Sequence, residues 1–297
     1  MQLRHIRYLL AVAEHGNFTR AAEALHVSQP TLSQQIIQLE ETLGVALLDR
    51  SGRTVKVTDA GRVYIEHARK ALRELASGRQ AILDVQDLAR GELRLATTPT
   101  FTAYLVGPLL AAFHARYPGI TVRLKEMSLD TIAAAVAADE VDLGIAFHVS
   151  RPADDIVCEP LLVERLSVVV GSKHRFVSQN NGITPQMLAT EKLGVLSPDF
   201  ATRQHVDDYL RSQGITPAVA IEANTISALI EVVRRSSVVT ILPEAIGAQH
   251  AGLCNIAISP APASRTAALL RRRDAYQSAA ASAFANLCKS IPTLGLA

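Results

Sequence analysis

The chain has 297 residues, of which 48% are hydrophobic and 20% charged, and its formal net charge is +2. This composition builds folded cores and excludes a disordered chain, while the length suits two or three domains. No run is apolar enough to cross a membrane, and residues 1–16 read as an amphipathic helix rather than a signal peptide. The odd number and wide spacing of the cysteines favour reduced thiols in a cytoplasm over a disulfide frame or a metal site.

Residues 18–43 predict two helices separated by a short break, which is the pattern of a helix-turn-helix. Asn17 can cap the first helix and Ser28 the second, and Pro30 falls in the first turn of the second helix, where a missing N–H costs nothing. An apolar stripe follows at helical spacing: Leu32, Ile36, Leu39 and Leu43. The polar side chains off this stripe are of kinds that hydrogen-bond base edges and phosphates in a DNA major groove. The alternative is an ordinary amphipathic helix pair in an all-helical core.

Residues 47–58 predict a β-hairpin with a Ser-Gly turn. Three cations lie at or near its tip: Arg50, Arg53 and Lys56. The unit is therefore a winged helix-turn-helix, in which cations of the wing hold phosphates while the second helix reads bases. Acidic and basic residues balance over residues 1–60, so only the placement of the charges favours DNA, and a weakly charged reader of this kind works as a dimer on two half-sites.

Residues 59–90 predict a single long helix, capped by Thr58 and closed by Arg90-Gly91. Apolar residues recur along it at three- and four-residue steps, interrupted by Arg79: Ile65, Ala68, Leu72, Leu75 and Ile82. Two such helices can pair as a coiled coil and hold two winged domains at a fixed separation. The alternative is a helix that packs on its own domain.

From residue 91 onward, strand and helix patterns alternate, which predicts two α/β lobes with a ligand between them. In the first lobe we expect strands at 92–96, 121–126 and 143–147, and helices at 104–115 and 129–138. In the second we expect strands at 167–170, 192–196, 218–222 and 238–242, and helices at 186–190, 202–213 and 225–234. A final helix at 276–290 completes the chain.

A cleft of this kind binds its ligand at strand ends and helix N-termini, where free N–H groups and the helix dipole favour an anion. Simple helix capping is the alternative for each hydroxyl there and stays open for Ser128 and Asn224. Four threonines within residues 97–102 exceed the need of one cap, so Thr98 and Thr100 are the foremost candidates. The candidate effector residues are Thr98, Thr100, Phe101, Ser128, Phe147, Ser197, Phe200, Thr202 and Asn224.

The motifs of common enzyme classes are missing from the sequence. It holds no GxSxG elbow, phosphate loop, GxGxxG, HExxH or CxxC, and its histidines do not pair at metal-ligand spacing. Residues 271–273 form an arginine run, which reads as a solvated strand end rather than as a second DNA contact. We expect no enzyme, no cofactor and no metal site. The hypothesis that competes with DNA binding is a small-molecule binding or catalytic protein that uses the helix-turn-helix only for dimer packing.

The chain resembles the LysR-type transcriptional regulators over its whole length. The resemblance is carried by segments 11–19, 21–22, 25–30, 39–44, 47–50 and 58–61. It implies an α+β multidomain protein: a winged helix-turn-helix at 1–58, a dimerisation helix at 59–90, and at 91–297 a two-lobed effector domain with the fold of periplasmic solute-binding proteins. Lobe I would comprise 91–161 and 266–297, and lobe II 162–265, with crossings near Leu161 and Arg265. The DNA contacts implied are Thr19, Arg20, Gln29, Pro30, Thr31, Ser33, Gln34, Arg50 and Arg53.

Within the family, segments 96–103, 143–147, 198–203, 221–224 and 234–237 resemble members that respond to cyanate. The chain departs from the broad family pattern at Ser236 and Val238, where many members carry glycine. The resemblance implies a small linear anion such as cyanate as effector, and a small carboxylate fits the polar cleft equally well. It further implies promoter DNA, a homodimer or homotetramer, and RNA polymerase as partners. The effector would change the angle between lobes or subunits and thereby the bend of the DNA.

Overall fold

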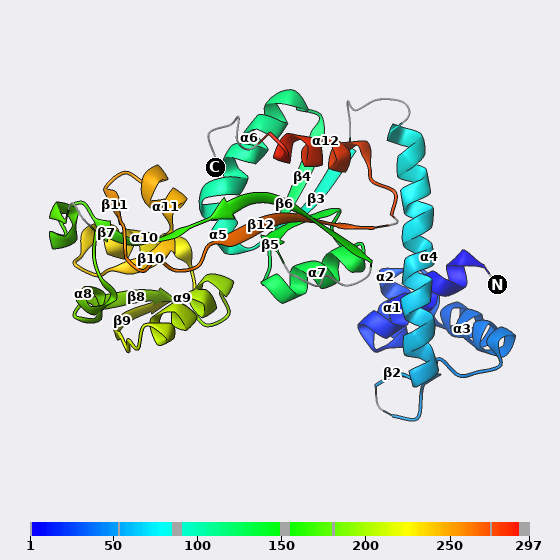
Figure 1. The fold of residues 1–297 in the computed structure, drawn as a ribbon. Helices are drawn as coiled ribbons and strands as arrows, with labels where there is room; N and C mark the ends of the chain where they lie inside the picture. Colours follow the sequence, from blue (N-terminus) through cyan, green and yellow to red (C-terminus); the bar gives the residue numbers. More distant parts are fainter. Residues whose placement is uncertain are drawn as a thin grey trace. The chain divides into compact units, whose positions relative to one another are not determined.

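The computed structural model describes residues 2–52, 54–84, 91–148, 155–179, 182–273 and 275–290. The chain divides into two compact units, Met1–Leu83 and Asp84–Ala297, and Figure 1 shows the elements of each. The wing residue Arg53 and the end of the expected linker helix, residues 85–90, lie outside the described residues.

The N-terminal unit contains the expected helix-turn-helix, hairpin and long helix. Asn17 caps the first helix of the motif by accepting from the backbone N–H groups of Thr19 and Arg20, and Ser28 caps the second by accepting from that of Thr31. Both predicted caps are confirmed. The elements are α1 Leu3–His15, α2 Phe18–Ala24, α3 Gln29–Leu43, β1 Leu48–Asp49, β2 Lys56–Val57 and α4 Asp59–Asp84.

The core of this unit is built from the apolar faces of α1, α2 and α3. Leu32, Ile36 and Leu39 are fully buried, as their spacing predicts, but the prediction was wrong for Leu43, which is 37% exposed. The stripe stops there because α3 ends at Leu43 and Gly44 turns the chain in the left-handed region. At the start of α4, a Cβ on Gly61 would lie 2.1 Å from the Leu47 carbonyl oxygen, so only glycine allows this close contact with the wing.

The long helix α4 has two different halves. Thr58 caps it by accepting from the Gly61 backbone N–H at 3.0 Å. Ile65 and Ala68 are buried, and Ile65 belongs to the core of the N-terminal unit. Leu75 and Ile82 are 55% and 66% exposed. The first half therefore packs on its own domain, and the second half leaves uncovered the apolar side chains that a coiled coil would bury.

Lobe I of the C-terminal unit is built on a five-stranded sheet in the order β4-β3-β5-β12-β6 (Figure 1). The predicted βαβαβ pattern is confirmed, because β3 pairs in parallel with β4 and β5. Two antiparallel strands, β12 and β6, complete the sheet beside β5. Its elements are β3 Gly91–Thr97, α5 Pro99–Phe101, the π-helix η1 Thr102–Val106, α6 Gly107–Arg116, β4 Ile120–Glu126, α7 Leu129–Ala137, β5 Leu143–Phe147, β6 Ile156–Glu164, β12 Arg265–Arg272 and α12 Ala279–Cys288.

Lobe I differs from the sequence prediction in three ways. The strands β6 and β12 were not predicted. The helix expected at 104–115 begins at Pro99, runs through a π-helical turn and continues as α6, so Thr100 and Phe101 lie in a helix and not in a loop. The chain does not leave the sheet near Leu161, because the register between β6 and β12 continues as far as the pair of Glu164 and Arg265. Both crossings between lobes therefore start from this pair.

Lobe II combines a three-stranded antiparallel sheet, β10-β7-β11, with the parallel pair β8-β9. An isolated bridge between Leu193 and Val239 links the two. The strand β11 and the helix α11 were not predicted, since each is short. The elements are β7 Leu166–Gly171, the 3-10 helix η2 Arg175–Ser178, α8 Pro185–Ala189, β8 Lys192–Leu196, α9 Ala201–Ser212, β9 Ala218–Ala223, α10 Ile226–Arg235, β10 Thr240–Pro243, α11 Glu244–Gln249 and β11 Leu253–Ile256.

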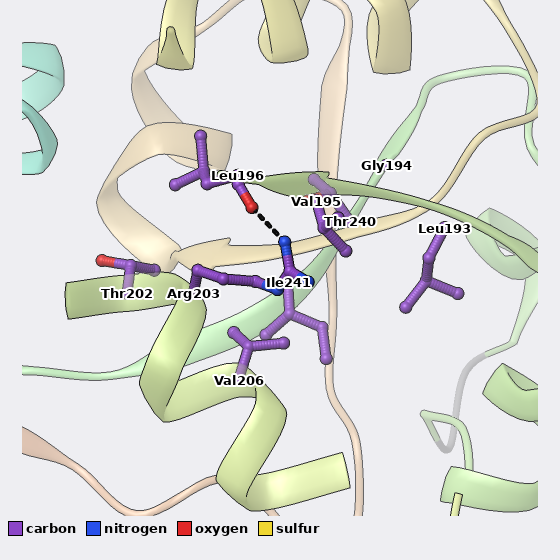
Figure 2. A pocket seen from close by; sticks show the side chains of 9 residues that line it. All are labelled: Leu193, Gly194, Val195, Leu196, Thr202, Arg203, Val206, Thr240 and Ile241. Atoms are coloured by element: carbon purple, nitrogen blue, oxygen red, sulfur yellow. Dashed lines mark hydrogen bonds between the residues drawn. The ribbon is translucent and has the colours of Figure 1, made fainter. Parts of the chain in front are cut away.

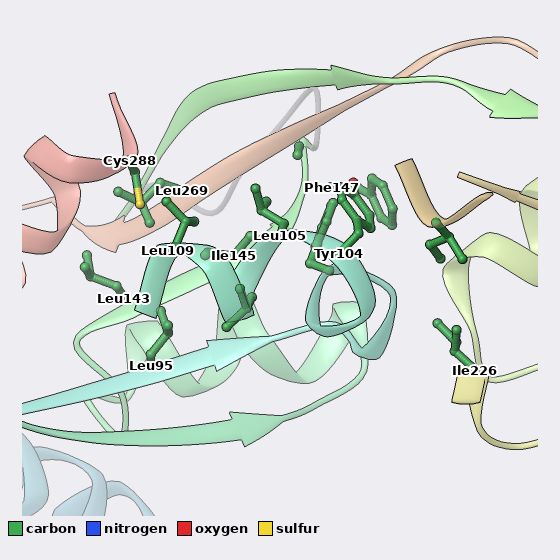
Figure 3. Packing of buried hydrophobic residues seen from close by; sticks show 14 of the residues in the cluster. Leu95, Tyr104, Leu105, Leu109, Leu143, Ile145, Phe147, Ile226, Leu269 and Cys288 are labelled. Atoms are coloured by element: carbon green, nitrogen blue, oxygen red, sulfur yellow. The ribbon is translucent and has the colours of Figure 1, made fainter. Parts of the chain in front are cut away.

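One hydrophobic cluster joins the two lobes. It fills the face of the lobe I sheet that α6 and α12 cover, and it continues past Tyr104 and Phe147 to Ile226 of α10 (Figure 3). The opposite face of the sheet packs against α7 in a separate cluster around Ile132 and Val136. All five residues of β5 are buried, which is what a strand covered on both faces requires.

Candidate DNA-binding surface and effector cavity

The second helix of the helix-turn-helix presents polar side chains on the face opposite the core. Gln29, Pro30, Thr31 and Gln34 are exposed and Ser33 is half-buried. Thr19 and Arg20, at the start of α2, are exposed as well. All seven are among the predicted DNA contacts, so the structure leaves these side chains accessible, as base and phosphate contacts require.

One of these side chains also serves the helix itself. The Ser28 hydroxyl lies 2.7 Å from the Thr31 hydroxyl and accepts from the Thr31 backbone N–H. Gln29 and Gln34 have no such local role among the hydrogen bonds of the described residues. They are therefore the clearest candidates for base contacts on this helix.

The wing cation Arg50 is held in place by Glu40 and Phe18. Its Nη2 donates to Glu40 at 2.7 Å, and its guanidinium lies 5.3 Å from the centre of the Phe18 ring. The other oxygen of Glu40 accepts from the backbone N–H groups of Leu47 and Leu48. Sequence reasoning missed Glu40, which ties the end of the second helix to the wing and orients Arg50. This ion pair is partly exposed, so it positions the guanidinium more than it stabilises the fold.

A cavity of about 270 Å³ lies at the strand ends and helix N-termini of the two lobes. Five of the nine predicted effector residues line it: Thr98, Thr100, Ser128, Phe200 and Asn224. Sequence reasoning did not single out the other lining residues: Pro99, Glu126, Met127, Leu129, Asp199 and Ala201.

Three helices begin at this cavity without a side chain capping them. The N-cap residues of α5, α7 and α9 are Thr98, Ser128 and Phe200, and none of their side chains accepts a backbone N–H. The Ser128 hydroxyl instead contacts that of Thr131 at 3.0 Å. The capping alternative therefore fails for Ser128. It fails for Asn224 too, because Thr225 is the residue that caps α10.

The polar groups of the cavity include one buried hydroxyl with no partner. Thr98 is 4% exposed, and its Oγ1 atom makes no hydrogen bond. No lysine or arginine is among the described residues that line the cavity, whereas Glu126 and Asp199 are exposed acids of its wall. Free N–H groups, hydroxyls and helix dipoles, rather than a paired cation, are what the cavity offers a ligand.

The remaining four predicted effector residues do not line this cavity. Phe101 is fully buried and packs against Phe147 with tilted rings whose centres are 4.8 Å apart, so both belong to the core behind the cavity wall. The hydroxyl of Ser197 donates to Asp199 at 2.5 Å. Thr202 is buried, and its Oγ1 lies 3.1 Å from that of Thr100. The four side chains therefore lie off the cavity for different reasons: Phe101 and Thr202 are buried at the start of a helix, Phe147 ends a buried strand, and Ser197 is held by Asp199.

A second hollow, beside α9, is a packing gap. Figure 2 shows how Arg203 reaches under β8 and donates to the Leu196 carbonyl at 2.5 Å. The same guanidinium pairs with Asp207 and Glu222. Burial alone would lower the pKa of Arg203, but the hydrogen bonds to these two acids outweigh that effect and raise the pKa above its usual value. The side chain therefore stays charged. The free space is about 10 Å³, room for one water at most.

The described residues contain no cluster of three or more histidine, cysteine or acidic side chains that would hold a metal ion. None of the helices in the described ranges is long and apolar enough to span a bilayer.

An exposed polar recognition helix beside a wing, followed by a two-lobed domain with a polar cavity, defines a class of protein: DNA-binding transcriptional regulators that respond to a small molecule. Residues 3–62 match the model described as a bacterial regulatory helix-turn-helix protein of the lysR family. Residues 86–291 match the LysR substrate binding domain. The chain belongs to the LysR family of transcriptional regulators.

Curated relatives cover nearly the whole chain. A hydrogen peroxide-inducible genes activator from Dickeya chrysanthemi is 30% identical over 92% of this chain and 90% of its own length. A RuBisCO operon transcriptional regulator from Allochromatium vinosum is 29% identical over 96% and 94%. These relatives are regulators with different names and do not single out a cyanate-operon activator. They also overturn the hypothesis of a helix-turn-helix used only for dimer packing.

Solved structures show the same architecture. Full-length OxyR from Pseudomonas aeruginosa, in a single-residue variant, matches with a TM-score of 0.73 over 97% of this chain and 95% of that one; at 23% identity it supports the fold alone. Full-length CbnR in complex with its target DNA matches with a TM-score of 0.65 and 26% identity, over 97% and 99%.

Proposed function

We propose that this regulator binds a small, singly charged anion in the cavity of its two-lobed domain and changes its grip on promoter DNA in response. The observation that carries the proposal is the set of three uncapped helix N-termini at the cavity, beside the buried and unpartnered hydroxyl of Thr98. Each N-terminus has backbone donors that a ligand oxygen can satisfy.

The acids of the cavity wall limit what this anion can be. Glu126 and Asp199 repel negative charge, and no lysine or arginine among the described lining residues offsets them. A dianion is therefore disfavoured. Cyanate and small monocarboxylates carry a single negative charge and fit within the cavity volume of about 270 Å³. The choice between them is what the first experiment below decides.

A response to hydrogen peroxide, which the names of some relatives suggest, has less support in these residues. Peroxide reacts with thiolates, and burial raises the pKa of the Cys288 thiol to about 12. Cys158 and Cys254 are half-buried and lie on β6 and β11, and none of the three cysteines forms a disulfide. We therefore place the response in the cavity.

On the DNA side, the proposed base contacts come from Gln29 and Gln34, with Ser33 and Thr31 beside them. Phosphates are held by Arg50 and, outside the described residues, by Arg53. The uncovered apolar side chains on the second half of α4 favour a homodimer through this helix, and the family resemblance extends this to a homotetramer. RNA polymerase completes the proposed partners. The protein acts in the cytoplasm, where promoter DNA lies, and catalyses no reaction.

A nuclease footprint on the DNA upstream of the gene tests this function, with and without millimolar cyanate, formate or acetate. We expect protection in every case and a footprint that shortens, or loses bend-induced cleavage, with one of these anions. Protection that ignores all three would retain the DNA-binding function and reject the small anion. Absence of protection would reject the assigned DNA contacts.

A further inference from the structure

The inference concerns a chain of buried polar side chains that joins the cavity wall to both crossings between lobes. Two residues of the cavity, Thr100 in lobe I and Ala201 in lobe II, mark its start. Thr100 shares a hydrogen bond of 3.1 Å with Thr202 at the first turn of α9. This bond links the two lobes directly at the cavity.

Arg265, the first residue of β12, holds the lobe II side of that link. Its Nη2 donates to Thr202 Oγ1 at 3.1 Å and its Nη1 to the Ala201 carbonyl at 3.2 Å. The guanidinium lies 3.8 Å from the centre of the Phe147 ring, which fixes its plane. One side chain thus holds the start of α9 against the end of β5.

The countercharge of Arg265 is Glu164, the last residue of β6. The two are direct cross-strand partners and form an ion pair with side chains 10% and 3% exposed. The remaining oxygen of Glu164 accepts from the Tyr104 hydroxyl at 2.7 Å. Burial and the adjacent carboxylate raise the pKa of Tyr104, so its hydroxyl stays protonated and donates. The pair therefore lies at both crossings and is fixed to the helix that starts at the cavity.

Burying this ion pair costs desolvation free energy, which argues for a role beyond stabilising the fold. A buried ion pair contributes little net stability compared with apolar side chains of the same size, and Arg265 Nε is buried with no hydrogen-bond partner. A second ion pair between the same two strands, Arg271 with Glu159, is partly exposed and has no connection to the cavity. The Arg271–Glu159 pair therefore links the two strands only, whereas the Arg265–Glu164 pair also contacts residues of the cavity wall.

We propose that Arg265 and Glu164 are positioning residues of the effector cavity: through Thr202, Ala201 and Tyr104 they set the relative orientation of the two lobes that the effector shifts. An effector that displaces Thr100 or Ala201 also displaces Arg265, and through it both crossings between the lobes. Two parts of this inference rest on the proposed function, namely the effector and the DNA readout. That Arg265 and Glu164 hold the two lobes together follows from the contacts alone.

The test measures amide hydrogen exchange by mass spectrometry in the full-length, ligand-free protein, for wild type, Glu164→Gln, Tyr104→Phe and the matched control Glu159→Gln. We expect exchange in residues 98–106 and 201–206 to rise about tenfold in Glu164→Gln and about threefold in Tyr104→Phe, with Glu159→Gln like wild type. Tyr104→Phe keeps the ion pair, so it decides the matter if Glu164→Gln does not fold.

Unchanged exchange in both segments for Tyr104→Phe, or a rise of the same size in Glu159→Gln, would overturn the proposal. So would a rise spread evenly over β6 and β12, because a purely structural pair would loosen the whole sheet. A second readout is the DNA bend angle from gel mobility on the upstream DNA, which we expect to change in Glu164→Gln and not in Glu159→Gln. Failure of the wild type to bind that DNA would count against the proposed function alone, since the exchange measurement needs no DNA.

Discussion

Three helices of the DNA-binding unit and three helices at the cavity begin in opposite ways. Asn17, Ser28 and Thr58 each supply a side-chain oxygen to a backbone N–H at the start of α2, α3 and α4. At the cavity, α5, α7 and α9 begin without such an acceptor. The first group completes its own hydrogen bonds, while the second leaves donors for something else. The contrast supports the proposal that a ligand binds the backbone donors at the cavity.

The largest effect is expected from removing the unpartnered cavity hydroxyl. In Thr98→Val, the anion loses one hydrogen bond of about 1.5–3 kcal/mol. The anion concentration that shifts the DNA footprint should rise at least about tenfold. DNA affinity without the anion should stay within a few-fold of wild type, as measured by the same footprint. Equal loss of both activities would show that the two regions are not separable.

The DNA-binding surface gives the next effect. Gln29→Ala should weaken binding to the upstream site by about 1–3 kcal/mol, because a bidentate amide contact to a base is lost. Gln2→Ala is the matched control, since Gln2 is exposed and its side chain caps nothing. Gel-shift titration at one fixed salt concentration measures both. Similar affinities for the two variants would remove Gln29 from the reading surface.

The comparison of helix starts is tested directly by stability. Asn17→Ala should lower the free energy of unfolding by about 1 kcal/mol, as for other lost N-caps. Ser128→Ala should change it by less than about 0.5 kcal/mol, because Ser128 accepts no backbone N–H. Urea unfolding of the full chain gives both values. A loss at Ser128 as large as that at Asn17 would mean that α7 depends on its serine as a cap.

The smallest effect concerns the acid on the cavity wall. Asp199→Asn removes a negative charge that no cation offsets within the described part of the wall, so the affinity for a small anion should rise about threefold. Calorimetric titration with the anion that shifts the footprint measures the change. Lower affinity in this variant would indicate a ligand with a positively charged group near Asp199.

The two regions also differ in how far the sequence predicts them. The helix-turn-helix depends on contacts within four residues, such as Ser28 with Thr31, so caps and apolar spacing were enough. The cavity residues Thr98, Ser128 and Asn224 were found because each lies at a helix start after a strand. Glu126 and Asp199 carry no local signal, since exposed acids are common in loops.

The residues behind the cavity wall escaped prediction for a related reason. Glu164 and Arg265 meet across 101 positions, and only the register of β6 with β12 brings them together. Phe101 and Thr202 were assigned to the ligand because their segments reach the cavity. The Phe101 side chain turns inward because the helix after β3 starts at Pro99 and not at Tyr104, and Thr202 is buried in the first turn of α9. Even when a segment is placed correctly from the sequence, the direction in which its side chains point is known only from the tertiary structure.

The central claim is that the uncapped helix starts bind the anion that controls this regulator. Backbone amide chemical shifts of the full chain, titrated in turn with cyanate, formate and acetate, test it most directly. For at least one anion we expect saturable shifts in the first turns of α5, α7 and α9, with the amides of residues 18–20 and 29–31 unchanged. Shifts confined to the DNA-binding unit, or none at the cavity for any of the three anions, would contradict the claim.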